Sequence, residues 1–168
     1  MKYSKSRENR LVFIKYHLII ISMRKTLVMA LFACDACMAA PSAHINGCLT
    51  ASAGKYGIHP QVLWAIAATE SNFNPTAIGR NDDSLDIGLM QINSGWLPRL
   101  ATFGITQQDL LNPCINIEVG AWILAHNIRQ YGYGWKAIGA YNAVTPAKRD
   151  RYARRVWRKL QQARLTQT

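Results

Sequence analysis

The sequence predicts a mainly α-helical single domain. The chain has 168 residues, which is the length of one domain with short extensions at its ends. Apolar residues recur at helical spacing in several segments, whereas the alternation typical of strands is nearly absent. A hydrophobic content of 49% with 17% charged residues excludes intrinsic disorder for most of the chain. No heptad pattern or fixed-period repeat is present, which excludes a coiled coil and a repeat protein.

The first segment, residues 1–43, is typical of an export signal. Basic residues after Met23, a short apolar run over residues 26–33 and small residues beyond it describe a secretory signal peptide. Met23 would be a normal start for such a signal, so the residues before it are either an extended signal or the product of a mis-assigned start at Met1. The run is shorter than the roughly 20 residues of a membrane-spanning helix. We expect a periplasmic protein; a lipid anchor at Cys34 is the less favoured alternative.

The cysteines agree with export. Cys34 and Cys37 fall within the expected signal, which leaves Cys48 and Cys114 as an even pair. An even pair in an exported protein predicts a disulfide. Cys34 and Cys37 also have the spacing of a redox or zinc motif, but their apolar flanks and the absence of a following βαβ pattern argue against that role.

The rest of the chain is expected to form one domain over residues 44–147 and a basic C-terminal helix over residues 148–168. Pro60 lies at a favourable first-turn position and begins a helix that ends at Glu70. Residues 71–86 are rich in Pro, Gly, Asn and Asp, and predict a loop. The remaining predicted elements are helical or short, and cover residues 88–96, 97–103, 106–111, 113–131 and 135–142, the longest helix being 113–131.

The positive charge is concentrated at the two ends of the chain. Residues 44–147 contain five basic and six acidic residues, whereas residues 148–168 contain eight basic and one acidic. A nucleic-acid-binding domain would carry its charge across the fold, so we expect no specific nucleic-acid partner. In the final helix one face can dock on the domain, and it consists of Tyr152, Val156, Trp157 and Leu160. The outward bases then form either a solvated face or a surface attracted to polyanionic cell wall or anionic lipid.

Glu70 and Glu118 are the two glutamates that follow the expected signal. Glu70 lies four residues after Ile66, so helical geometry places it on the buried face near the helix end. Because no Lys or Arg lies between Lys55 and Arg80, burial should raise its pKa. A carboxylic acid that stays protonated near neutral pH is what general-acid cleavage of a glycosidic bond requires. The alternative is that Glu70 simply caps the helix end. Glu118 lies early in a helix, where a carboxylate is favourable, and is expected to be structural.

Three short blocks carry a resemblance to a known family. Glu70-Ser-Asn-Phe-Asn-Pro75, Gly88-Leu-Met-Gln-Ile-Asn93 and Ala140-Tyr-Asn142 resemble the blocks of the soluble lytic transglycosylase (SLT) domain. The similarity covers about Cys48 to Ala143 and is strongest to the branch encoded with secretion, conjugation and pilus systems. It implies a lysozyme-like, goose-type fold and a transglycosylase that cleaves peptidoglycan glycan strands. Components of such a system are further candidate partners.

The resemblance also implies roles for individual residues. It makes Glu70 the catalytic acid and Ser71 the residue that orients it, and it places the Tyr141 hydroxyl close to the acid. Met90 would either line the groove or fill the core. The expected substrate contacts are Ser71, Met90, Gln91, Tyr141 and Asn142. The family often has Gly shortly after the third block, whereas this chain has Ala143-Val144, so we expect the outer rim of the site to bend differently.

The expected mechanism uses one acid. Glu70 would protonate the bridging oxygen and then take a proton from the C6 hydroxyl of the same sugar, which forms a 1,6-anhydro ring. We expect no cofactor and no metal, because the histidines at positions 44, 59 and 126 show no ligand spacing. A muramidase that hydrolyses the bond with a second carboxylate is the alternative enzyme, with Asp82, Asp83 or Asp86 in that role. A non-catalytic peptidoglycan-binding scaffold of a secretion system is the alternative from another class.

Overall fold

The computed structural model describes residues 42–165, which lie within one compact unit. Nearly all of the expected signal segment, including Cys34 and Cys37, lies outside the described residues. The helices are α2 (Ala43–Tyr56), α3 (Pro60–Glu70), α4 (Leu97–Ala101), α5 (Pro113–Tyr131), α6 (Trp135–Ala140) and α7 (Pro146–Leu165). The strands are β1 (Ile78–Arg80), β2 (Leu85–Ile87) and β3 (Ile92–Asn93), and 3-10 turns cover Ser94–Trp96 and Asp109–Leu111. Within this part of the chain, none of the helices is both long and apolar enough to cross a bilayer.

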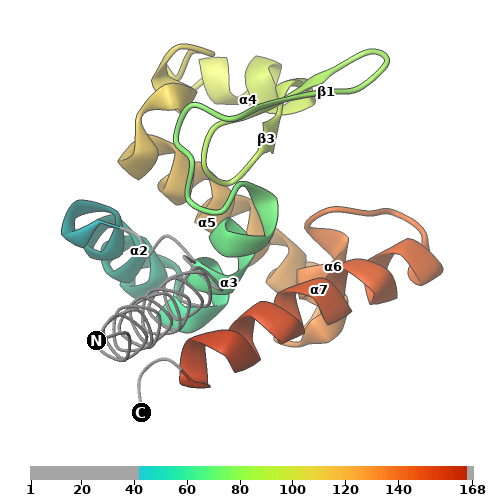
Figure 1. Ribbon diagram of the computed structural model, residues 1–168. Coiled ribbons are helices and arrows are strands. Elements are labelled where there is room, and N and C mark those ends of the chain that lie inside the picture. Colours follow the sequence, from blue (N-terminus) through green and yellow to red (C-terminus); the bar gives the residue numbers. More distant parts are fainter. Residues whose placement is uncertain (1–41, 166–168) are drawn as a thin grey trace, which may run out of the picture. The chain divides into compact units, whose positions relative to one another are not determined.

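The helices pack around α5. Helix α2 lies against α5, α3 lies against α7, and α6 bridges α5 and α7. In Figure 1 the sheet and α4 lie above α3, and α6 and α7 lie below and to the right of it. The mainly α fold class predicted from the sequence is confirmed, with a small sheet added to it.

The two helices predicted with the clearest start signals begin and end where the sequence indicates. Pro60 and Pro113 occupy the first turns of α3 and α5. The Asn112 side chain accepts hydrogen bonds from two backbone N–H groups at the start of α5, which are among the donors that a helix leaves unpaired. The core contains the apolar faces of both helices, with Leu63 and Ile66 from α3 fully buried among them.

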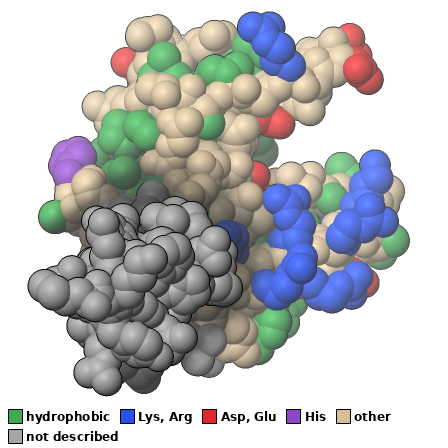
Figure 2. Space-filling model, viewed as in Figure 1, with side chains coloured by type: hydrophobic (Ala, Val, Ile, Leu, Met, Phe, Trp, Pro, Cys, Tyr) green, Lys and Arg blue, Asp and Glu red, His purple; other side chains and the backbone are tan. Residues whose placement is uncertain are grey.

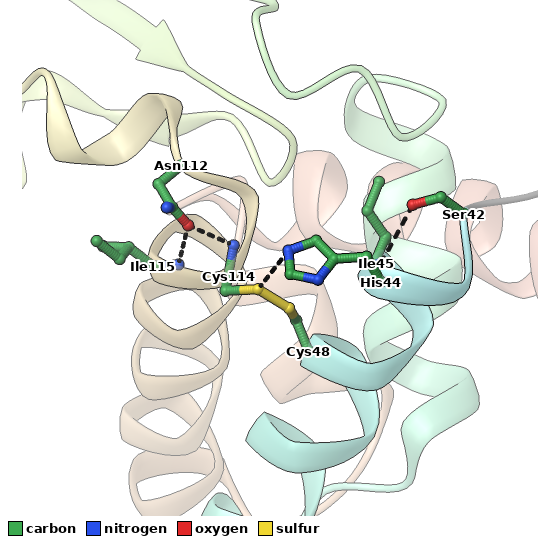
Figure 3. Close-up of a disulfide and its surroundings, with 7 residues drawn as sticks. All are labelled: Ser42, His44, Ile45, Cys48, Asn112, Cys114 and Ile115. Atoms are coloured by element: carbon green, nitrogen blue, oxygen red, sulfur yellow. Dashed lines mark hydrogen bonds between the residues drawn. A yellow bond between two sulfur atoms is a disulfide. The ribbon is translucent and has the colours of Figure 1, made fainter.

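Helix α2 was not predicted from the sequence. Ser42 caps its start through a hydrogen bond from the backbone N–H of Ile45, and Gly57 ends it in the left-handed conformation, with φ of 65°. A disulfide between Cys48 and Cys114 joins this helix to the first turn of α5, with a Cα–Cα distance of 5.1 Å. Figure 3 shows the bond in place between the two helices. The pairing is the one that the cysteine count predicts.

The loop predicted for residues 71–86 was wrong in part, because this stretch contains β1 and the start of β2. Strands β1 and β2 pair antiparallel, with Ile78 opposite Ile87, and β3 pairs with the other edge of β2. The strands are only two or three residues long. Such strands are too short to show a readable alternation, which explains why the sequence pattern missed them.

Helix α7 packs on the domain with three of the four residues predicted for its docking face. Tyr152, Val156 and Leu160 are buried, but Trp157 is 41% exposed. The ring of Trp157 makes an edge contact with Trp135 of α6, with 5.3 Å between ring centroids. The expectation for Trp157 was therefore wrong: its position lies at the border of the buried face, where the ring reaches α6 but stays partly in solvent.

Candidate active site

Glu70 is the last residue of α3, and the chain turns sharply after it. Asn72 and Phe73 both have positive φ angles, which ends the helix. The Ser71 hydroxyl donates a hydrogen bond to the Leu89 carbonyl at 2.7 Å and accepts one from the Asn74 backbone N–H at 3.0 Å. Ser71 therefore ties the end of α3 to the loop before β3. Its orienting effect on Glu70, implied by the family resemblance, can act only through this backbone anchor, since its described hydrogen bonds go elsewhere.

The environment of Glu70 favours its protonated form. Burial is the largest cause and raises the pKa to about 7 from its ordinary 4.5, and the nearby negative charge of Asp86 adds to the rise. Two groups of α7 oppose this shift: the Tyr152 hydroxyl, which donates a hydrogen bond to Glu70 Oε1, and the positive charge of Arg155. The raised pKa predicted from burial is confirmed. No Lys or Arg is near Glu70 along the chain, and the nearby positive charge comes from Arg155, on a helix far along the chain.

A polar cavity of about 330 Å³ opens beside Glu70. Three of the residues assigned by resemblance, Gln91, Tyr141 and Asn142, line it together with Glu70. Five other lining residues were not predicted from the sequence as part of the site, and these are Asn81, Ile92, Asn93, Trp96 and Ile123. Hydrogen-bonding amides and a tryptophan beside an acid suit a ligand with many hydroxyl and amide groups, such as an aminosugar.

Gln91 is held in a strained backbone conformation at the edge of this cavity. Its φ is 49°, a left-handed value that a residue with a side chain rarely adopts. Its amide nitrogen donates to the carbonyls of Ala77 and Gly88, at 3.2 and 2.8 Å. The side-chain oxygen lies only 2.9 Å from where a Cβ of Gly79 would be, so the absence of a side chain there makes room for Gln91. Gln91 therefore shapes the cavity wall as well as lining it.

Tyr141 lines the same cavity as Glu70, and its hydroxyl donates a hydrogen bond to the Met90 carbonyl at 3.0 Å. The hydroxyl that contacts Glu70 belongs to Tyr152, whose ring stacks on that of Tyr141 with 6.4 Å between centroids. Met90 is completely buried and does not line the cavity, so it fills the core, one of the two roles expected for it. Gly120 makes this packing possible, because a Cβ there would lie 2.8 Å from Met90 Cε.

Of the three aspartates considered as a second carboxylate, only Asp86 lines the cavity. Its two oxygens accept hydrogen bonds from the side-chain amides of Asn81, at 3.0 Å, and Asn93, at 2.8 Å. Asp82 and Asp83 lie exposed in the turn between β1 and β2. Asp86 therefore holds three segments of the small sheet together while it faces the same cavity as Glu70.

Asn116 supports the cavity from inside α5 and was missed as a functional position. Its side chain is completely buried. The side-chain oxygen accepts from the Met90 backbone N–H at 2.6 Å, and the amide donates to the carbonyls of Ile87 and Leu110, both at 2.8 Å. One side chain thus pairs three backbone groups that the loop around Gly88 would otherwise bury unsatisfied. A buried Asn inside an apolar helix face was the sequence signal for this role.

One histidine lies closer to the cysteines than its sequence spacing suggested. His44 Nε2 is 3.3 Å from Cys114 Sγ, and His44, Cys48 and Cys114 form the one group of potential metal ligands within residues 42–165 (Figure 3). The two sulfur atoms are bonded to each other, and a disulfide sulfur lacks the thiolate charge that binds metal. The ring of His44 therefore packs on an intact disulfide.

The fold and the cavity beside Glu70 already indicate the class of domain to which the chain belongs. The described fold matches that of an inactive mutant of Lytic Transglycosylase Slt from Pseudomonas aeruginosa, with a TM-score of 0.62 and 25% sequence identity. The match covers 81% of this chain and 26% of that chain, so this chain spans about a quarter of the larger protein. The class is that of lysozyme-like domains with a glutamate at the end of a helix beside a small sheet.

Residues 47–163 match the model of the Transglycosylase SLT domain, and the chain belongs to this family. The match runs through α7, so the basic helix lies within the family domain. Invasion protein IagB of Salmonella typhimurium strain SL1344 is 49% identical over 108 residues, covering 61% of this chain and 68% of that protein. Protein IpgF of Shigella flexneri is 36% identical over 118 residues, covering 67% and 78%. The X polypeptide of Escherichia coli K12 is 39% identical over 102 residues, covering 60% of each.

Proposed function

We propose that this chain is a peptidoglycan lytic transglycosylase. It cleaves the β-1,4 bond between N-acetylmuramic acid and N-acetylglucosamine and leaves a 1,6-anhydro ring on the muramic acid. The observation that carries the proposal is the placement of Glu70, buried at the end of α3, with a pKa of about 7, at the wall of a polar cavity. Membership of the SLT family supports the reaction class. A relative from Escherichia coli O157:H7, 37% identical over 125 residues, is named peptidoglycan-binding-like protein, which supports the substrate.

The first step needs a proton on Glu70, and the site provides for it. Tyr152 donates its hydrogen bond to Oε1, which leaves Oε2 to carry the proton. Glu70 passes this proton to the bridging oxygen as the bond from C1 to that oxygen breaks, so the N-acetylglucosamine leaves with a free hydroxyl. The new carboxylate keeps the Tyr152 hydrogen bond and the nearby positive charge of Arg155, both of which favour the charged form.

The second step returns the proton to Glu70. The substrate's own N-acetyl group stabilises the positive charge that develops at C1. Glu70, now a base, removes the proton from the C6 hydroxyl of the same sugar, and the C6 oxygen forms a bond to C1. Attack from within one sugar avoids the entropy cost of capturing a water molecule. The enzyme ends the cycle with Glu70 protonated, as it began.

A hydrolytic muramidase is the second candidate, and Asp86 is the observation that favours it. Asp86 is a second carboxylate that lines the cavity of Glu70, so it could activate a water molecule. Its oxygens already accept hydrogen bonds from Asn81 and Asn93, which fixes them to the sheet and opposes a role as a mobile base.

Mass analysis of the fragments released from purified sacculi separates the two reactions. Transglycosylation gives fragments that end in 1,6-anhydro-N-acetylmuramic acid, which is lighter by one water than the hydrolysis product and lacks a reducing end. The Asp86→Asn variant should release the same anhydro product, at a lower rate if the sheet is disturbed. Reducing ends from the wild-type protein would establish a hydrolase in its place. Binding to sacculi without release of any fragment would identify a scaffold.

We propose further that the protein is exported and opens the wall for a secretion, conjugation or pilus apparatus. The signal-like segment at the N-terminus and the disulfide support export, since such bonds persist in oxidising compartments. The relative IagB of Salmonella typhimurium is named an invasion protein, which supports a role beside such an apparatus. Fractionation of cells that express the full chain tests export: the mature protein should appear in the periplasmic fraction, shortened at its N-terminus.

A further inference from the structure

A small basic groove runs between α3 and α7, outside the cavity of Glu70. It has a volume of about 200 Å³, and the residues that line it are Thr69, Arg155, Arg158, Lys159 and Gln162. Three of these five residues carry a positive charge and none carries a negative one. Lys and Arg side chains gather over α7 in Figure 2, whereas the rest of this face shows few of them. A lining of this charge favours an anionic ligand.

The groove lies directly beside the acid. Thr69 precedes Glu70 in α3, and Arg155 Nη2 donates a hydrogen bond to the Thr69 carbonyl at 3.3 Å. The guanidinium of Arg155 also lies over the ring of Tyr152, 5.9 Å from its centroid, and Tyr152 contacts Glu70. Arg155 therefore links the lining of the groove to the acid, through Thr69 on one side and Tyr152 on the other.

The chemistry of the groove selects a carboxylate over a neutral sugar. Arginine presents a planar fork of N–H donors that matches a carboxylate. The glycan backbone of peptidoglycan is uncharged, whereas the stem peptide on each muramic acid carries free carboxylates. Building on the proposed function, we propose that the α7 groove, formed by Thr69, Arg155, Arg158, Lys159 and Gln162, binds carboxylates of the stem peptide and makes the protein select peptide-bearing strands.

Other bases of α7 provide the internal control. Arg154 is exposed like Arg158, but it lines a different hollow, together with Trp135, Asp150 and Trp157. A general attraction of the helix to polyanions or to anionic lipid would use Arg154 and Arg158 alike. Recognition of the stem peptide in the groove would depend on Arg158, which lines the groove, and not on Arg154, which does not.

The test measures kcat/KM on two substrates: glycan strands with their stem peptides, and the same strands after the carboxylates of the stem peptides have been converted to neutral methylamides. Arg158→Gln should lower the ratio of the two kcat/KM values, untreated over amidated, about two- to fivefold, the range expected for one exposed charge pair. Arg158→Lys should restore most of the ratio, because it keeps the charge. Arg154→Gln should leave the ratio at the wild-type value. Thermal melts of each variant confirm that it is folded.

An unchanged ratio in Arg158→Gln would overturn the inference, and so would an equal fall in Arg158→Gln and Arg154→Gln, which would indicate a diffuse attraction. Titration of the wild-type protein with free stem tetrapeptide, followed by NMR, tests the groove without turnover. Shifts at the backbone amides of residues 155–162 that are lost in Arg158→Gln support it, and their absence contradicts it. Failure of the proposed function looks different: the wild-type protein would cleave neither substrate, whatever the peptide titration shows.

Discussion

Glu70 and Glu118 are the same side chain in two opposite environments. Glu118 projects from α5, is 47% exposed and forms an ion pair with Lys55 of α2. Glu70 ends α3, and its hydrogen-bond partner is the hydroxyl of Tyr152, a side chain only 2% exposed. The partner in solvent is a cation, whereas the partner in the interior is a neutral phenol that tolerates a protonated acid. Reactivity is therefore set by what surrounds the carboxyl group, and only one of these surroundings produces an acid that works near neutral pH.

The sharpest way to test this comparison is to replace each glutamate by glutamine. Glu70→Gln removes the proton donor and keeps the shape of the side chain, so release of fragments from sacculi should fall by about a thousandfold, within the range for loss of a general acid. Glu118→Gln should stay within about twofold of the wild type, since Glu118 does not line the cavity. Comparable losses in the two variants would mean that Glu70 has no special chemical role.

The second expectation concerns stability against pH. The folded-state pKa of Glu70 is about 7 and the ordinary value is 4.5, so between these values the folded protein binds more protons than the unfolded chain. The contribution of this group to stability is therefore fully present below about pH 4.5, falls as the pH rises towards 7, and is lost above it. The total loss is about 3 kcal/mol in the free energy of unfolding. Urea denaturation at a series of pH values should show this fall in the wild type, and Glu70→Gln should be flatter and more stable at pH 8.

The third expectation removes the phenol that distinguishes the two environments. The Tyr152 hydrogen bond lowers the pKa of Glu70, so Tyr152→Phe should raise it and move the alkaline fall of the pH–rate profile to higher pH. The acid also loses a positioning contact, which should lower kcat by about ten- to a hundredfold. Tyr141→Phe serves as the matched control, because its hydroxyl bonds the Met90 carbonyl and should leave the profile near its wild-type position. A Tyr152→Phe profile at the wild-type position would contradict the assignment.

The smallest effect is expected at the solvent-side pair. Both Lys55 and Glu118 are largely exposed, so their attraction is screened by water and salt. Lys55→Gln should lower the melting temperature only slightly, and the difference from the wild type should shrink further in high salt. A large, salt-independent loss would show that the pair is a structural link comparable to the disulfide that also joins α2 to α5.

The sequence predicted the helices around Glu70 well because their signals are local. Pro60 and Pro113 mark helix starts, and the apolar spacing up to Glu70 placed that carboxyl group on a buried face. The sequence did not predict the short strands of the sheet, because such strands are held by pairing with their neighbours and are too short to show an alternating pattern. The hydrogen bond from Tyr152 to Glu70 spans 82 positions of the chain, so no local rule could find it. A tyrosine on the apolar face of the last helix was the available hint, because a buried hydroxyl needs a partner.

The place of Tyr152 on the final helix has a consequence for the order in which the site is completed. As a ribosome makes the chain, the three sequence blocks of the cleft, ending with Asn142, emerge before α7 does. Until α7 packs against α3, Glu70 lacks its hydrogen bond from Tyr152 and the contact between the two helices. We therefore expect the environment of the acid to be completed only after α7 has been made and has packed, so that a chain cut before α7 contains the three blocks without the complete surroundings of Glu70.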